Sequence, residues 1–192
     1  MIRLSTMATV VIAVGSCSHG DASVPQRAHY GVGRPATAQE IAARDIDVGP
    51  DGVGLPAGSG TTVQGEAIFA QKCASCHGAR GEGKMPLYPR LIGRDPAAEG
   101  FVFARQPGAA RTIGNYWPYA TTVFDYIRRA MPQTAPGSLN NDEVYALTAY
   151  LLAANEVIPM GSSIDSSSLR AVRMPYASRF VPDNRHGGRE VK

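Results

Sequence analysis

Five consecutive residues, Cys73-Ala74-Ser75-Cys76-His77, constrain this chain more than any other feature. They place two of its three cysteines three positions apart, with a histidine directly after the second. A cysteine pair of this kind serves as a redox dithiol, as half of a zinc site, or as the attachment point of a haem. In the haem case both thiols bond to the haem vinyl groups, and the following imidazole faces the iron. The fifth residue, a histidine, favours haem.

The two other uses of the pair have less support elsewhere in the sequence. Zinc needs four ligands, and the remaining histidines, His19, His29 and His186, form no second cluster. A thioredoxin-like dithiol is expected at a strand-to-helix turn, whereas apolar residues have helical spacing before Cys73, at Val63, Ala67 and Ala70. The motif therefore predicts one haem c, bound covalently by Cys73 and Cys76 with His77 as an iron ligand.

The domain organisation follows from length and from the distribution of glycine and proline. A chain of 192 residues accommodates one ordinary domain with extensions. Glycine and proline concentrate outside residues 61–155, so we expect one haem domain there, flanked by irregular arms at 18–60 and 156–192. The net charge of +3 gives no reason to expect nucleic acid as a partner.

The first 17 residues, MIRLSTMATVVIAVGSC, read as a signal peptide. A basic start at Arg3 precedes an apolar run that ends at Val14, which is too short to span a bilayer. The end of this segment resembles the lipobox of bacterial lipoproteins, which implies that Cys17 is acylated and anchors the mature protein to a membrane. The alternative is cleavage beyond Cys17. Both readings predict export to the bacterial periplasm.

A second iron ligand is expected after the haem motif, and three methionines precede prolines: Met85, Met131 and Met174. Met85 is too close in sequence to His77 to reach the other face of a haem. Met131 lies between two segments with helical periodicity, which can hold a loop in place, and it is the predicted ligand. Met174, in a proline-containing tail, is the alternative.

Further residues resemble the class I cytochromes c. In that family a glycine and an aromatic residue on the N-terminal helix cross an aromatic residue on the C-terminal helix, and Gly65, Phe69 and Tyr150 look like this contact. Pro89 resembles the proline whose carbonyl accepts the Nδ1 proton of the haem histidine. The resemblance implies an all-α class I cytochrome c fold around one haem. Such a fold suits electron transfer.

Longer segments, at 33–60 and 114–132 and near the C-terminus, are similar to haem c subunits that partner sulfite-oxidase-type molybdenum dehydrogenases. This resemblance implies a molybdenum-cofactor dehydrogenase, oxidising sulfite or another sulfur compound, as electron donor. A terminal oxidase or another cytochrome would be the acceptor. The sulfane dehydrogenase subunit resembles a two-haem protein, whereas this chain has one haem motif, which favours the sulfite type.

Several alternatives stay open from the sequence. With Met131 bound, the iron has no free position and the protein is an electron carrier, for the sulfur enzyme or for a different periplasmic dehydrogenase. With Met131 absent or labile, it is a haem enzyme or sensor. Trp117 and Tyr119 either bind a haem propionate or line the pocket. The arm, with a capping box at Thr37–Glu40 that predicts a short helix to Arg44, either docks on a partner or acts as a spacer.

Overall fold

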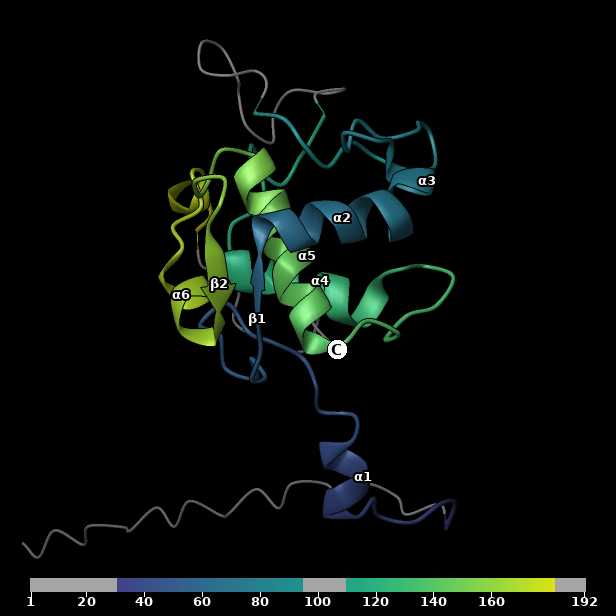
Figure 1. Cartoon of the computed structure of the whole chain (residues 1–192). Helices are drawn as coiled ribbons and strands as arrows, with labels where there is room; N and C mark the ends of the chain where they lie inside the picture. Colours follow the sequence, from purple (N-terminus) through teal and green to yellow (C-terminus); the bar gives the residue numbers. More distant parts are fainter. Residues whose placement is uncertain (1–30, 95–109, 182–192) are drawn as a thin grey trace, which may run out of the picture. The chain divides into compact units, whose positions relative to one another are not determined.

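The computed structural model describes residues 31–94 and 110–181 of the chain, and α-helices dominate it (Figure 1). The predicted signal peptide and Cys17 lie outside the described residues. The elements in chain order are α1 (Ala38–Ala42), β1 (Ser59–Thr61), α2 (Thr62–Lys72), α3 (Ala74–His77), α4 (Ala120–Ala130), α5 (Asn141–Ala154), β2 (Ser163–Asp165), α6 (Ser166–Ala171) and the 3-10 helix η2 (Ala177–Arg179). Among the described helices, none has both the length and the apolar character needed to cross a membrane.

The chain divides into two units, Met1–Ala38 and Gln39–Lys192. In the first unit, residues 31–38 are described, and all are exposed. The capping box at Thr37 predicts a short helix, and the structure has one, α1, which ends two residues before Arg44. The second unit contains the predicted haem domain.

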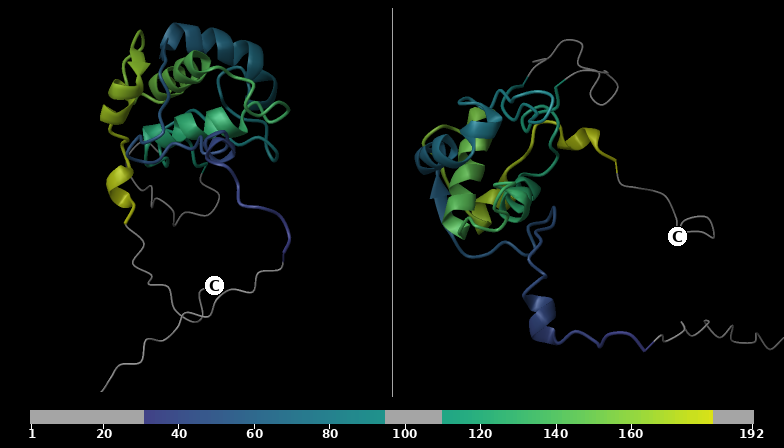
Figure 2. Two further views of the ribbon diagram at one scale, coloured as in Figure 1. Left: turned by 90° about the horizontal axis from the view of Figure 1, so that it is seen from below. Right: turned by 90° about the vertical axis from the view of Figure 1, so that its right-hand side faces the viewer.

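Helix α5 lies at the centre of this domain, and all its residues from Val144 to Ala153 are buried. It packs between α2 and α4, as Figure 2 shows in its left view. The helices stop and start at defined caps: Thr61 and Gln64 form a capping box at α2, and Asn140 and Glu143 form one at α5. The core is therefore a three-layered helical stack, as expected for the predicted all-α fold.

The crossing of α2 and α5 depends on glycine at position 65. A Cβ atom there would overlap the backbone carbonyl of Ala146, so a side chain would force the two helices apart. One turn further along α2, the ring of Phe69 lies 5.3 Å from that of Tyr150, measured between centroids. The structure thus brings together the three residues that resemble the helix contact of class I cytochromes c.

The packed domain extends past residue 155, where the sequence predicts that an irregular arm begins. Strand β2 pairs antiparallel with β1, with Gly60 opposite Ile164. Ile164, Leu169 and Met174 are all buried in the hydrophobic core. The apolar side chains of this polar segment pack on the core. They are too widely spaced in the sequence to give a periodic pattern, so the sequence did not predict this packing.

The domain also extends before residue 61, where the sequence predicts a spacer or a docking arm. Val48 is 3% exposed, and its N–H donates to a carboxylate oxygen of Asp125 at 2.8 Å. The carbonyl of Pro50 accepts from Thr121 at 3.0 Å, and the carbonyl of Pro56 accepts from the Tyr145 hydroxyl at 2.8 Å. Residues 46–58, which we call the strap, are thus part of the domain: their backbone groups are satisfied by its side chains instead of by regular structure.

Candidate haem site

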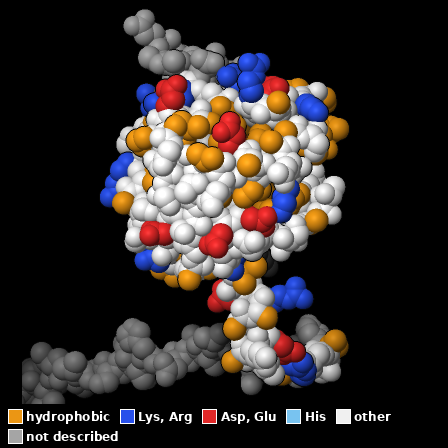
Figure 3. Space-filling view, in the orientation of Figure 1, with side chains coloured by type: hydrophobic (Ala, Val, Ile, Leu, Met, Phe, Trp, Pro, Cys, Tyr) orange, Lys and Arg blue, Asp and Glu red, His pale blue; other side chains and the backbone are white. Residues whose placement is uncertain are grey.

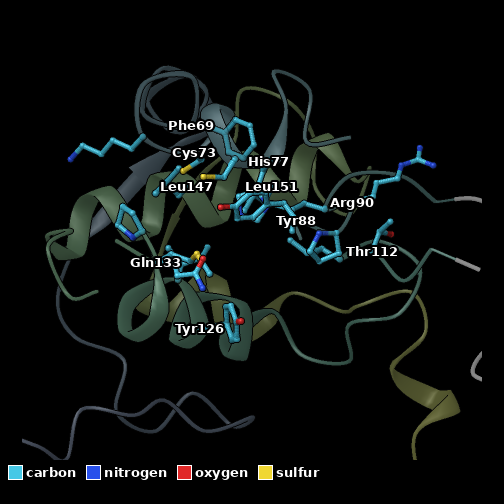
Figure 4. Close-up of a pocket in the computed structure, with 18 of the residues that line it drawn as sticks. Phe69, Cys73, His77, Tyr88, Arg90, Thr112, Tyr126, Gln133, Leu147 and Leu151 are labelled. Carbon is cyan, nitrogen blue, oxygen red and sulfur yellow. The ribbon is translucent and has the colours of Figure 1, made fainter. Parts of the chain in front are cut away.

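A cavity of about 560 Å³ opens between α3 and α5 on one side and α4 on the other. Its volume is in the range of ligand and cofactor sites, roughly 300 to 1,000 Å³. Figure 4 shows Cys73 and His77 pointing into it from one side and Tyr126 and Gln133 facing them. Of the residues predicted for the site, Cys73, Cys76, His77, Pro89, Trp117 and Met131 line this cavity.

Helix α3 presents the two cysteines and the histidine on a single turn. The His77 N–H donates to the Cys73 carbonyl at 2.9 Å, and the turn stops at Gly78, whose φ of 81° a residue with a side chain rarely adopts. The following loop folds back onto the turn: Gly83 donates to the His77 carbonyl at 2.8 Å, and Lys84 Nζ donates to the Ser75 carbonyl at 2.5 Å. The motif is therefore held firmly although it is only one turn long.

The imidazole of His77 is suited to bind iron. Burial lowers its pKa, and the carbonyl of Pro89 raises it against this larger effect, so the net pKa lies below the usual histidine value. The ring is then neutral at neutral pH, as metal binding requires. Its Nδ1 atom is buried and forms no hydrogen bond with any described residue, so the expected bond from Nδ1–H to the Pro89 carbonyl is not formed, although that carbonyl raises the pKa of the ring.

The thiol of Cys73 is a poor candidate for redox exchange. Burial raises its pKa to about 11, with Lys72 acting in the opposite direction. Dithiol enzymes need a thiol with a lowered pKa, because the thiolate is the reactive form. Within the described residues, no three His, Cys, Asp or Glu side chains converge as a metal cluster.

Met131 lies directly after the last residue of α4, and its N–H donates to the Ile127 carbonyl at 3.1 Å. Together with His77 it lines the cavity and a smaller adjoining pocket. The two other candidates are placed differently: Met85 is 75% exposed, Met174 is buried in the core, and neither lines the cavity. Of the three candidates, Met131 is the one that lines the same cavity as His77.

Comparison with known proteins gives consistent matches. A family model described as cytochrome c oxidase, cbb3-type, subunit III, matches residues 60–151. A chain of the sulfane dehydrogenase SoxCD of Paracoccus pantotrophus is 40% identical, with a TM-score of 0.69, and the match covers 81% of this chain and 73% of that one.

This chain belongs to the class I cytochromes c.

Two curated relatives are named thiosulfate dehydrogenase. The protein of Psychrobacter arcticus is 32% identical over 94 residues, which are 46% of this chain and 24% of the relative. The protein of Stutzerimonas stutzeri is 26% identical over 144 residues, which are 73% of this chain and 40% of the relative. The cytochrome thus spans less than half the length of these relatives, and it is related to proteins of sulfur-compound oxidation.

The cavity fits the haem c of this family. Beside the two cysteines and the histidine it has an apolar lining, which includes Phe69, Ile113, Ile127, Leu147 and Leu151. Among the described residues that line it, Lys72, Arg90 and Arg111 carry a charge, and each charge is positive. Arg90 and Thr112 lie together at one end (Figure 4). An apolar slot with cations at its border matches a flat apolar macrocycle that carries two propionates.

The two aromatic residues predicted for the pocket, Trp117 and Tyr119, differ in position. Trp117 lines the cavity, but its indole N–H already donates to Thr122 Oγ1 at 2.8 Å, so it serves as wall and not as a free donor for a propionate. Tyr119 is 42% exposed at the N-terminus of α4 and is not among the described residues that line the cavity. Tyr119 is the N-cap residue of α4, and its side chain makes no capping hydrogen bond.

Sequence reasoning missed two residues that shape the site. The ring of Tyr88 meets that of His77 edge-on, with centroids 6.1 Å apart, and it borders the cavity. Asn155 is fully buried after α5: its Oδ1 accepts from Gly93 and Gly114 at 3.0 and 3.1 Å, and its Nδ2 donates to Leu151 at 2.8 Å. A polar residue directly after the apolar C-terminal half of α5 was the available signal for Asn155.

Proposed function

We propose that this cytochrome carries single electrons from a molybdenum-dependent dehydrogenase of sulfite, or of another sulfur compound, to the respiratory chain. The observation that supports it most is the placement of His77 and Met131 at one cavity. A haem closed by these two ligands has no open coordination position, which suits electron transfer and not substrate chemistry.

The haem c supplies one-electron chemistry, and the protein's residues set its conditions. Cys73 and Cys76 would hold the group covalently, and the neutral imidazole of His77 would supply a nitrogen ligand to the iron. The apolar lining excludes water, which lowers the reorganisation that accompanies electron transfer. The cations Lys72, Arg90 and Arg111 favour the form with one additional electron, and so raise the reduction potential.

The sulfur assignment is supported by the relatives. The solved structure that matches this chain is named a sulfane dehydrogenase, and two curated relatives are named thiosulfate dehydrogenases. The single haem motif favours a sulfite-type donor. A terminal oxidase or another cytochrome is the proposed acceptor, in the periplasm, with the chain held to a membrane through lipid on Cys17. Cys17→Ser should then move the protein from the membrane to the soluble fraction.

The names of the relatives also support a second function, in which this chain takes part in thiosulfate oxidation itself. A stopped-flow experiment separates the two. The purified oxidised cytochrome is mixed with a molybdenum sulfite dehydrogenase and sulfite, with an alcohol dehydrogenase and its substrate, or with thiosulfate alone, and haem reduction is followed by absorbance. Fast reduction in the sulfite mixture supports the carrier. Reduction by thiosulfate alone supports the second function, and reduction by the alcohol enzyme alone overturns the sulfur assignment.

A further inference from the structure

We propose that Asn155 is a positioning residue for the haem: its side chain joins two loops of the cavity wall, and removing it lowers the reduction potential. The loops are residues 91–93 and 112–114, here called the 91–93 loop and the 112–114 loop. The proposal rests on the proposed role as electron carrier and adds a residue that sets the potential of that carrier. It does not depend on which enzyme donates the electron.

The amide of Asn155 is fully buried and bonds to both loops. Its Oδ1 accepts from the N–H groups of Gly93 and Gly114 at 3.0 and 3.1 Å. Its Nδ2 donates to the carbonyls of Leu91 at 3.3 Å and of Leu151 at 2.8 Å. An amide side chain has two N–H groups and an oxygen that accepts two hydrogen bonds, so its whole bonding capacity is used at the cavity wall.

The two loops also contact each other beside this amide. The Ile113 N–H donates to the Leu91 carbonyl at 3.1 Å, and the Thr112 hydroxyl donates to the Gly93 carbonyl. A Cβ atom on Gly114 would lie 2.6 Å from Oδ1 of Asn155, which is closer than such atoms can approach. The 112–114 loop is therefore as near to Asn155 as a glycine allows.

The backbone of Asn155 is fixed by the way in which α5 ends. Glu156, the next residue, has a φ of 58°, which residues other than glycine rarely adopt. The Val157 N–H closes the end of the helix by donating to the Leu152 carbonyl at 2.9 Å. Asn155 thus links the two loops to the most deeply buried helix of the domain.

The two loops carry apolar and charged parts of the cavity lining. Leu91 and Ile113 belong to its apolar part, and Thr112 also lines it. The cations Arg90 and Arg111 each precede one of the loops directly and line the cavity too. Figure 3 shows Lys and Arg side chains gathered at the top of the domain, where the segments that flank residues 95–109 lie in Figure 1.

Separating the loops would change the surroundings of the haem in two ways. Water would reach the haem beside Leu91 and Ile113, and the positive charges of Arg90 and Arg111 would move away from it. Both changes favour the oxidised form, which carries the additional positive charge, and burial is one of the means by which a protein sets a haem potential. A residue that only supports folding would lower stability and leave the potential unchanged.

The test compares Asn155→Ala with a buried polar residue away from the haem. Thr62→Val is the matched control: Thr62 is 0% exposed, accepts from the Gly161 N–H at 2.9 Å and lines neither pocket. Each haem-loaded protein is titrated by spectroelectrochemistry. At the midpoint potential of the wild type, Asn155→Ala should lower the ratio of reduced to oxidised haem at least about threefold, and Thr62→Val should leave it unchanged, although both lower the melting temperature.

A second variant displaces a loop and keeps the amide. Gly114→Ala places a methyl group against Asn155 Oδ1 and should shift the ratio in the same direction. Hydrogen exchange, followed by mass spectrometry, then compares the peptides that contain the two loops. Their exchange should be faster than in the wild type in Asn155→Ala and Gly114→Ala, but not in Thr62→Val.

An unchanged ratio in Asn155→Ala or in Gly114→Ala overturns the proposal. An equal shift in Thr62→Val overturns it as well, because the potential would then follow stability in general. If neither loop variant retains haem while Thr62→Val does, Asn155 is needed for folding, and its role in the potential is rejected. A shift in both loop variants, with no reduction of the wild type by a molybdenum sulfite dehydrogenase and sulfite, keeps this proposal and rejects the sulfur donor.

Discussion

The wall of the haem cavity that carries Cys73, Cys76 and His77 is built by neighbours in sequence, whereas the facing wall is held by distant segments. The first wall is closed by bonds such as that from Gly83 to His77, six residues apart. The second consists of α4 and Met131, and α4 is fastened to the strap by the bonds from Val48 to Asp125 and from Thr121 to Pro50. The first wall is therefore a local structure, and the second depends on the tertiary fold.

The largest loss of stability is expected when the strap, which holds the second wall, is removed. A chain that starts at residue 59 behind an export leader loses the buried Val48 and several hydrogen bonds to α4 and α5. Burial of the Val48 side chain contributes about 1.5 to 3 kcal/mol, and each hydrogen bond contributes about 1 kcal/mol. Its free energy of unfolding should fall by at least about 3 kcal/mol. Urea unfolding, followed by haem absorbance, measures this.

A shorter deletion is the control. A chain that starts at residue 45 loses described residues that are all exposed, so its stability should change by less than about 0.5 kcal/mol. Equal stability of the two shortened chains would show that the strap contributes nothing to the second wall.

A smaller effect is expected from crowding the first wall at Gly65. Gly65→Ala places a methyl group against the Ala146 carbonyl, and α2, which leads into Cys73, must move away from α5. Overpacking of this kind costs about 1 to 3 kcal/mol. Val63→Ala, on the same helix at a site 68% exposed, is the matched control and should change stability little. Thermal unfolding of the three proteins compares them, and a Gly65→Ala protein as stable as wild type would contradict the close helix crossing.

The stability of the second wall should depend on pH through the carboxylate of Asp125. Burial alone would raise the pKa of this carboxyl, but hydrogen bonds from Arg129 and from the Val48 N–H outweigh burial, and the pKa lies below its usual value of 3.8. A lowered pKa means that the ion contributes stability above about pH 4, and that this contribution is lost as pH falls through the folded-state pKa. Asp125→Asn should therefore cost about 1 to 2 kcal/mol at pH 7, and less below about pH 4. A pH-independent difference would contradict this.

The same contrast explains what could be predicted from sequence. Cys73, Cys76 and His77 form a local motif whose residue types state their chemistry, and Gly65 and Phe69 are one helical turn apart. The strap could not be predicted, because its backbone groups bond to Asp125, Thr121 and Tyr145, which lie more than 70 positions away. The exposed position of Tyr119 could not be predicted either, because the direction of a side chain at a helix start depends on how the helix packs.

The proposed ligation of one haem by His77 and Met131 can be tested by the absorption spectrum of the oxidised protein. Ligation by a thioether gives a sulfur-to-iron charge-transfer band. Met131→Ala should abolish this band and let added imidazole bind the iron, whereas Met174→Ala, at a buried core position away from the cavity, should keep the band despite lower stability. A band that persists in Met131→Ala and disappears in Met174→Ala would contradict the account.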